Sequence, residues 1–185
     1  MAKGEIRTRM VSSAARLLAE NGPTGASVGD VLADSGAARG STYHHFPGGK
    51  RELYVAALDL ASDRAYAALE GVRGQPARAV LDEFFAMWRT LLTHTDLRLG
   101  CAVLAVAVAG DDPATVDHAG EIFRSWRGHL ESLLLDAGTD PVRARALAAV
   151  AISAAEGAVA IARAEQSLEI FELVAAEVIS MTEPR

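Results

Sequence analysis

The sequence predicts an all-α protein of about nine helices, in which a three-helix module with a helix-turn-helix precedes a larger helical domain. Two observations favour this fold class. Alanine accounts for 37 of the 185 residues and aromatic residues for only 5%, a composition that favours helices over strands. Apolar residues also recur at helical spacing between breaks that contain Gly, Pro, Asn or Asp.

The first 48 residues have the breaks of a compact three-helix module. The helices are expected from Gly4 to Asn21, from Ser27 to Ser35 and from Ala38 to Phe46. Asn21-Gly22-Pro23 ends the first helix, because Pro cannot continue it. Ser27 is a good N-cap for the second, with Asp30 as its capping-box partner, and Gly36 ends it. Pro47-Gly48-Gly49 closes the module.

The remaining residues form six longer helices in this prediction. They are expected from Lys50 to Gly71, from Pro76 to Thr93, from Leu97 to Ala109, from Ala114 to Ala137, from Val142 to Ala164 and from Leu168 to Met181. Proline-containing breaks such as Asp111-Asp112-Pro113 separate them. We therefore expect a helix-turn-helix domain over residues 1–48 and a second domain over residues 49–185.

Composition excludes several classes of protein. A single cysteine excludes an intramolecular disulfide framework and a cysteine-cluster metal site. The N-terminal residues lack the apolar segment of a signal peptide, and no uncharged apolar run approaches the ~18 residues of a membrane span. We expect a cytoplasmic protein without a metal ion, a cofactor or a membrane partner.

Charge is divided unevenly along the chain. Residues 1–51 carry seven basic and four acidic side chains, a net charge of +3, whereas the rest of the chain has a net charge of −9. The overall charge of −6 therefore argues only weakly against nucleic-acid binding, because only the docking face must be basic.

The turn Asp34-Ser35-Gly36-Ala37 matches that of a helix-turn-helix. The third expected helix carries the polar residues Arg39, Ser41, Thr42, Tyr43, His44 and His45. Arg can bond guanine bidentately, and hydroxyl groups can donate to phosphate oxygens. Lys50 begins the next helix, where backbone N–H groups already favour a phosphate. Lys3, Arg7 and Arg9 could clamp the flanking backbone. These residues predict that the protein binds double-stranded DNA.

These residues also carry a family resemblance over Thr8–Leu58. The residues concerned are Ala14-Ala15-Arg16-Leu17-Leu18, Asn21-Gly22, Ser27-Val28, Val31-Leu32, Gly36, Arg39-Gly40-Ser41-Thr42-Tyr43-His44-His45-Phe46 and Lys50-Arg51-Glu52-Leu53. The run resembles the DNA-binding domain of TetR-family transcriptional regulators. Three segments are similar to the LmrA/YxaF branch of that family, namely His45–Lys50, Gly100–Val103 and Glu156-Gly157-Ala158. His45–Lys50 is one residue longer than the usual family spacing.

The resemblance implies that the third helix lies in the major groove. By position, Ser27, Tyr43, His45 and Lys50 would contact phosphates, while Arg39 and Ser41 would reach base edges. The full expected contact set is Ser27, Arg39, Gly40, Ser41, Thr42, Tyr43, His44, His45 and Lys50. The alternatives are a core position for Tyr43 and simple solvent exposure for Arg39, His44 and His45. One module reads too little sequence, so we expect a dimer on a pseudo-palindromic operator.

Bulky side chains in the second domain predict a pocket. The expected lining residues are Phe84, Met87, Trp88, Cys101, Phe123 and Trp126. Because Trp faces attract cations and Met adapts its shape, the ligand would be a small apolar or weakly cationic effector. The alternative is an ordinary core, with Cys101 as a small buried hydrophobe or, less simply, a sensor thiol. Glu156 could be a counter-ion in the pocket or lie exposed at an interface.

The last two expected helices are apolar and rich in small residues, which lets helices approach closely. Two copies would form a four-helix homodimer interface, unless the helices only close the core of one chain. Together these features predict a ligand-responsive transcriptional repressor without catalytic residues. The alternative is a dimeric helical small-molecule-binding protein or enzyme on the same fold that binds no specific DNA.

Overall fold

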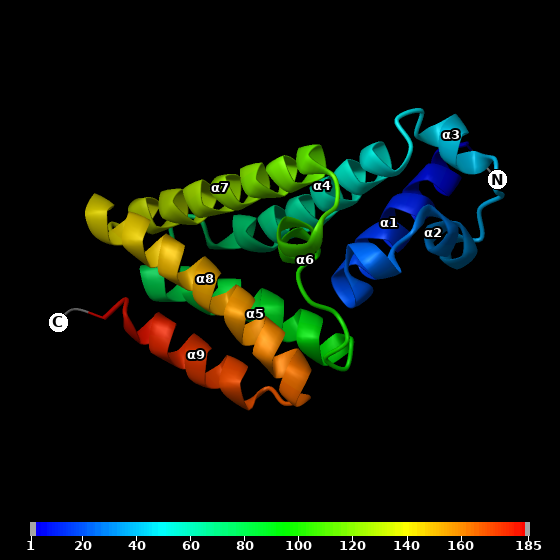
Figure 1. Ribbon diagram of the computed structural model, residues 1–185. Coiled ribbons are helices and arrows are strands. Elements are labelled where there is room, and N and C mark those ends of the chain that lie inside the picture. The colour runs from blue at the N-terminus through cyan, green and yellow to red at the C-terminus, as the bar shows by residue number, and fades with distance from the viewer. Residues whose placement is uncertain (1–2, 184–185) are drawn as a thin grey trace. The chain divides into compact units, whose positions relative to one another are not determined.

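The computed structural model describes residues 3–183, with side chains from Gly4 onward (Figure 1). Within that range it has nine α-helices, two short 3-10 helices and no strand, which confirms the all-α fold. The elements are α1 (Lys3–Asn21), η1 (Pro23–Gly25), α2 (Val28–Ser35), α3 (Ser41–His45), α4 (Lys50–Leu69), η2 (Glu70–Val72), α5 (Ala77–His94), α6 (Ala102–Ala109), α7 (Pro113–Asp136), α8 (Pro141–Glu165) and α9 (Glu169–Ser180).

The chain forms two compact units. The first unit contains residues up to 63 and 101–122, and the second unit contains residues 64–100 and those from 123 onward. The division passes through α4 and α7, so each of these helices contributes to both units. The first unit extends beyond the expected boundary between residues 48 and 49 because α6 packs against α1 and η1. The expected boundary between residues 48 and 49 stays a prediction of where the DNA-binding domain ends and the second domain begins.

The first unit is built around one apolar face of α1. Met10, Ala14 and Leu18 are fully buried, and the fully buried Phe46 closes the same core. The expected capping box is confirmed: the Ser27 hydroxyl accepts a hydrogen bond from the Asp30 backbone N–H, and the Asp30 carboxylate accepts one from the Ser27 N–H.

A polar contact ties α1 to α2. The Asp34 carboxylate accepts a hydrogen bond from the Arg16 guanidinium and another from the Ser13 hydroxyl at 2.5 Å. These two donors, Arg16 foremost, hold the pKa of the Asp34 carboxyl below its usual range. The charged form of Asp34 therefore helps to fix α2 on α1 at neutral pH.

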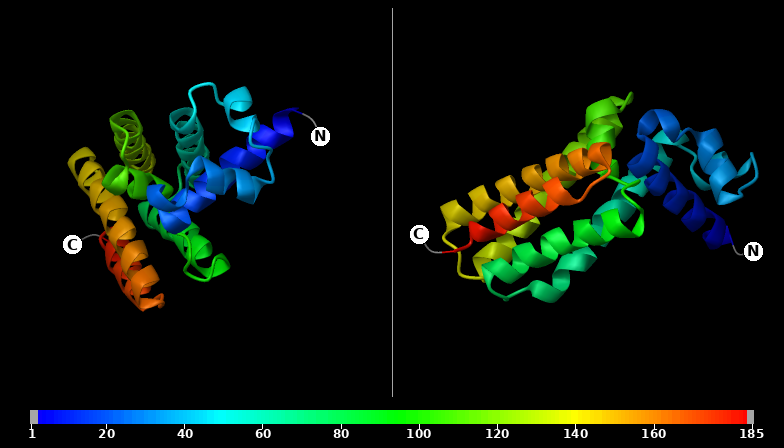
Figure 2. Two further views of the ribbon diagram at one scale, coloured as in Figure 1. Left: turned by 45° about the vertical axis from the view of Figure 1, so that its right-hand side comes forward. Right: turned by 90° about the horizontal axis from the view of Figure 1, so that it is seen from below.

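The second unit is built from α5, α8 and α9, which pack against one another (Figure 2). Phe85 and Phe171 are fully buried, and their rings meet at 6.0 Å between centroids. Arg89 donates two hydrogen bonds to Glu172, at 2.6 and 2.7 Å, and so joins α5 to α9. By length and composition α8 could cross a membrane, but half of its apolar window is buried inside the fold. The core helix of a globular protein has the same composition.

Two expected helix starts are wrong. The third helix begins at Ser41 rather than Ala38, because Ala38, Arg39 and Gly40 form a turn closed by a bond from the Ser41 N–H to the Ala38 carbonyl. The sixth begins at Ala102 rather than Leu97. Asp96 and Leu97 take left-handed backbone angles, with φ of 51° and 56°. This conformation ends the preceding helix and keeps the residues just before α6 from being helical.

Candidate functional site

The segment between α2 and α3 is a tight turn that depends on Gly36. Its φ of 65° and ψ of 24° lie in the left-handed region, which residues with a Cβ resist. In this conformation the Gly36 and Ala37 N–H groups both donate to the Leu32 carbonyl, closing the end of α2. The chain then turns toward α3. The helix-turn-helix predicted from the sequence is therefore present, formed by α2 and the shorter helix α3.

Most of the expected DNA-contact residues lie together on the turn and on α3. Arg39, Gly40, Tyr43 and His44 are exposed, and Ser41 and His45 are half-buried. Tyr43 is the clearest case, because its side chain is 76% exposed. That exposure excludes the alternative in which Tyr43 closes the core of the module. Such a large exposed aromatic side chain on a short polar helix is available to a partner surface.

Thr42 corrects the expected contact set. It is only 2% exposed, and its hydroxyl has no hydrogen-bond partner within residues 3–183. The physical reason is helical spacing: Thr42 lies one turn before Phe46, the fully buried residue that accompanies it into the core. Thr42 packs the inside of the module and does not reach a partner in this conformation.

Two other expected contacts already have partners within the chain. The Ser27 hydroxyl donates to the Asp30 carboxylate at 2.6 Å in addition to capping α2. The Lys50 ammonium group lies 5.1 Å from the centre of the Tyr54 ring and donates to the Asp111 carboxylate. Of the basic residues of α1, Arg7 stacks over the Phe46 ring, Arg9 is exposed, and the Lys3 side chain lies outside the described residues.

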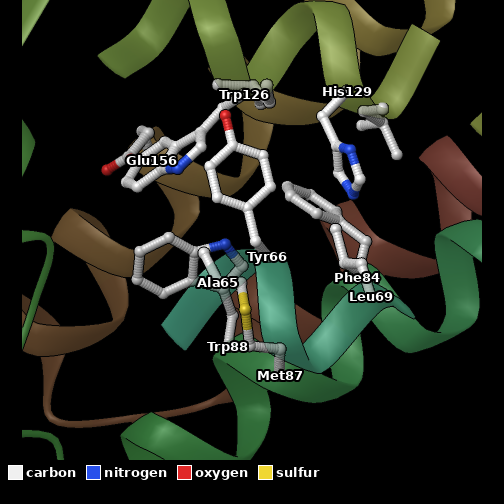
Figure 3. A pocket seen from close by; sticks show the side chains of 11 residues that line it. Ala65, Tyr66, Leu69, Phe84, Met87, Trp88, Trp126, His129 and Glu156 are labelled. Carbon is white, nitrogen blue, oxygen red and sulfur yellow. The ribbon is translucent and has the colours of Figure 1, made fainter. Parts of the chain in front are cut away.

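A second candidate site is a cavity inside the second unit (Figure 3). Four helices supply its walls: α4, α5, α7 and α8. The lining residues are Ala65, Tyr66, Leu69, Phe84, Met87, Trp88, Trp126, His129, Leu130, Ile152 and Glu156. Figure 3 shows the ring of Tyr66 beside the imidazole of His129. The walls are thus aromatic, with one buried carboxyl group at Glu156.

Four of the six expected pocket residues line this cavity, namely Phe84, Met87, Trp88 and Trp126. Phe123 does not line it and instead meets the Trp126 ring edge-on, at 5.5 Å between centroids. Cys101 does not line it either. Its sulfur accepts a hydrogen bond from the Leu104 N–H and so caps α6, in the first unit. The expectation that Cys101 forms a pocket wall is therefore wrong for this cavity.

Tyr66 and His129 line the cavity although no sequence pattern predicts them there. They lie 63 positions apart on α4 and α7, and their rings meet edge-on at 4.8 Å. Burial lowers the pKa of the His129 imidazole, which favours its neutral form. Trp88 Nε1 and His129 Nε2 are both buried and lack a hydrogen-bond partner among the described residues. The cavity therefore presents two polar ring atoms that a bound molecule could satisfy.

The cavity is nearly filled by its own side chains. Its free internal space is about 30 Å³, which is room for one or two water molecules. A ligand of several non-hydrogen atoms can enter only if lining side chains or helices move.

A third feature is an apolar face of α8. Val142, Val150 and Ile161 are exposed along it, and Ala146 and Gly157 lie exposed between them. A Cβ added at Gly157 would meet no atom within 4 Å. On the neighbouring helix α9, Leu173 is 62% exposed. An apolar row interrupted by small residues allows close approach of another helix.

Two family models match separate parts of the chain. The description "Bacterial regulatory proteins, tetR family" matches residues 11–57, which include α2 and α3. The description "Transcriptional regulator LmrA/YxaF-like, C-terminal domain" matches residues 76–177. These matches agree with the resemblance seen in the sequence.

Individual relatives and solved structures agree with the family. An uncharacterized HTH-type transcriptional regulator of Mycobacterium tuberculosis is 37% identical over 175 residues, covering 91% of this chain and 89% of the relative. The HTH-type regulator LmrA of Bacillus subtilis is 25% identical, covering 86% and 87%. A TetR regulator structure from Chloroflexus aurantiacus is 25% identical with a TM-score of 0.76, covering 96% and 94%. An Agrobacterium tumefaciens structure shares the fold at 19% identity, with a TM-score of 0.84 and coverage of 97% and 98%. The chain therefore belongs to the TetR family, as a helix-turn-helix DNA-binding transcriptional regulator and not an enzyme.

Proposed function

We propose that this regulator is a cytoplasmic homodimeric repressor that leaves a pseudo-palindromic operator when a small molecule binds in the cavity of the second unit. The observation that carries the proposal is the path of α4. This helix begins at Lys50, beside the helix-turn-helix, and its last turns contribute Ala65, Tyr66 and Leu69 to the cavity wall. One continuous helix thus belongs to both candidate sites.

In the proposed complex α3 lies in the major groove. Tyr43, His45 and Lys50 contact phosphates, and Arg39 and Ser41 reach base edges, with Gly40 and His44 beside them. The exposure of Arg39 and Tyr43 supports these roles. Because Arg39 precedes α3 instead of lying on it, its guanidinium enters the groove from the turn. Ser27 can contact a phosphate only if its hydroxyl leaves the Asp30 carboxylate.

The proposed dimer uses α8 and α9. The exposed apolar row from Val142 to Ile161 and the exposed Leu173 support this choice, because water contact with such side chains is unfavourable. Two copies would pack as a four-helix interface. Dimerisation places two copies of α3 on one DNA duplex, and they fit successive major grooves when about 34–36 Å apart.

The proposed effector is a small apolar or weakly cationic molecule. The aromatic walls and the buried Glu156 support this chemistry, because ring faces and a carboxylate both favour a cation. Since the cavity has so little free space, binding must displace lining groups, including those of α4. The effector would then favour a conformation in which α4 holds the DNA module at the wrong spacing. Its effect on DNA affinity cannot exceed its differential affinity for the two conformations.

The first experiment is selection of bound sites from a random pool of duplex DNA by the full chain. We expect enrichment of a pseudo-palindrome, and the variants Arg39→Ala and Tyr43→Ala should lose the selected site while the dimer persists. Binding that is equally strong for all sequences would instead favour a small-molecule-binding protein without an operator. The selected DNA would identify the genes under control.

A second experiment tests the cavity. The chain contains only two tryptophans, Trp88 and Trp126, and both line the cavity. Intrinsic tryptophan fluorescence therefore reports on this site alone. We expect a compound that changes this fluorescence also to release the selected DNA. Fluorescence changes that never alter DNA affinity would refute the proposed coupling.

A further inference from the structure

The acidic turn between α6 and α7 contacts the first two residues of α4 within the first unit. The Lys50 ammonium group donates to both Asp111 carboxylate oxygens, at 3.1 and 3.3 Å. Arg51 donates to both carboxylate oxygens of Asp112, at 2.8 and 2.7 Å. Each pair joins residues 61 positions apart in the sequence. Two neighbouring cations are thus paired with two neighbouring anions at the edge of the helix-turn-helix.

The two pairs differ in how firmly they are held. Asp112 is fixed, because its carbonyl accepts a hydrogen bond from the Thr115 hydroxyl at 2.8 Å and its bonds to Arg51 are bidentate. Asp111, by contrast, has a side chain that is 73% exposed. The hydrogen bonds from Lys50 hold the pKa of the Asp111 carboxyl below its usual range, so the carboxylate is charged at neutral pH. Asp111 therefore places a negative charge in solvent directly beside the Lys50 ammonium group.

We infer that Asp111 competes with DNA phosphate for Lys50, and that the Asp112–Arg51 pair holds this competitor in place. The inference rests on the proposed phosphate contact of Lys50. A phosphate that approaches the Lys50 ammonium group meets the Asp111 charge within a few ångströms. It must displace the carboxylate or share the cation with it, and either outcome weakens the attraction. The acidic turn thus reduces sequence-independent affinity without touching the residues that reach base edges.

The expected size of the effect follows from the exposure of the pair. An exposed ion pair interacts weakly, so removing the Asp111 charge should strengthen DNA binding by about two- to fivefold. The salt dependence gives a second readout. If Lys50 neutralises a phosphate more fully, the slope of log affinity against log salt should steepen by up to about 0.9 per protomer. A purely structural role of Asp111 would not steepen that slope.

The test is a double-mutant cycle in the full chain on a mixed-sequence DNA duplex, followed by fluorescence anisotropy at several salt concentrations. The variants are Asp111→Asn, Lys50→Ala and the combination of the two. Asp117→Asn is the matched control, since Asp117 is an exposed acid near the start of α7, the helix that follows the acidic turn, and its loss changes net charge equally. Circular dichroism verifies that each variant is folded.

The expected result is that Asp111→Asn strengthens binding and steepens the salt slope, that Asp117→Asn does less, and that the gain disappears when Lys50 is already Ala. Equal effects of Asp111→Asn and Asp117→Asn would overturn the inference, because only net charge would matter. Weaker binding by Asp111→Asn would also overturn it, because Asp111 would then position Lys50 for DNA. If Lys50→Ala alone leaves affinity unchanged, the proposed role of Lys50 fails, and the inference fails with it for that separate reason.

Discussion

Tyr54 couples the start of α4 to the chain before α2, and its hydroxyl group gives a quantitative prediction. The side chain is 2% exposed, and the hydroxyl oxygen lies 3.0 Å from the carbonyl oxygens of both Pro23 and Ala26. The variant Tyr54→Phe keeps the ring and removes the hydroxyl group that donates to these two carbonyls. Leaving buried acceptors unpaired should reduce the free energy of unfolding by about 1–3 kcal/mol at neutral pH.

The same residue predicts how stability changes at alkaline pH. Burial foremost, with help from the charges of Asp111 and Asp30, raises the pKa of Tyr54 from 10.0 to about 12. A pKa that is higher in the folded state contributes stability that is present below the unfolded value and is lost as pH rises toward the folded value. The full shift corresponds to about 2.7 kcal/mol, of which about 1.3 kcal/mol is lost between about pH 9 and about pH 11.

The assay is urea denaturation followed by far-ultraviolet circular dichroism across that pH range. Wild type should lose stability more steeply than Tyr54→Phe, so that the two curves converge as pH rises. Tyr43→Phe is the control at neutral pH, because its hydroxyl belongs to a side chain that is mostly exposed and should cost little. Parallel curves for wild type and Tyr54→Phe would refute the reasoning, because the buried hydroxyl would then not resist ionisation.

Three further predictions concern the proposed sites. Tyr43→Ala should weaken operator binding by at least about tenfold. Thr42→Val should leave operator binding unchanged and should keep or raise stability, since it removes a buried unpaired hydroxyl. Gel-shift titration measures the binding of both variants, and thermal melting measures their stability. If the proposed dimer uses α8, Gly157→Arg should yield a 19.4 kDa monomer in light scattering, while Gly128→Arg, at an equally unobstructed position on α7, should not. Glu156→Gln should abolish a fluorescence-detected preference for naphthylmethylamine over its neutral analogue naphthylmethanol, and an unchanged preference would exclude the carboxyl group as counter-ion.

Most helices could be predicted from the sequence because their ends carry local signals. The capping box at Ser27 and the left-handed Gly36 are short-range features that any fold containing α2 would use. The start of α6 could not be predicted in this way. Leu97 has a positive φ although its side chain disfavours that conformation, and Cys101 serves as a helix cap through its sulfur. Tertiary packing overrides local preference at both residues.

The candidate sites show the same limit. The polar residues near α3 were visible in the sequence because they are contiguous, but the sequence does not say which side of a five-residue helix faces inward, and so Thr42 was misplaced. Tyr66 and His129 were missed because only the packing of α4 and α7 brings them together. The ion pairs of Lys50 and Arg51 were missed for the same reason.

The charge of the folded first unit explains why these missed pairs matter. Its two chain segments contain seven basic and eleven acidic residues, so the positive charge of the first 51 residues does not persist once residues 52–63 and 101–122 join them. DNA attraction must therefore come from the local arrangement of a few cations and not from the field of the whole unit. In that setting one carboxylate beside Lys50 is expected to weaken DNA binding by about two- to fivefold. Binding to unrelated DNA should accordingly be weak, and discrimination should depend mainly on the groups that α3 and its turn present to base edges.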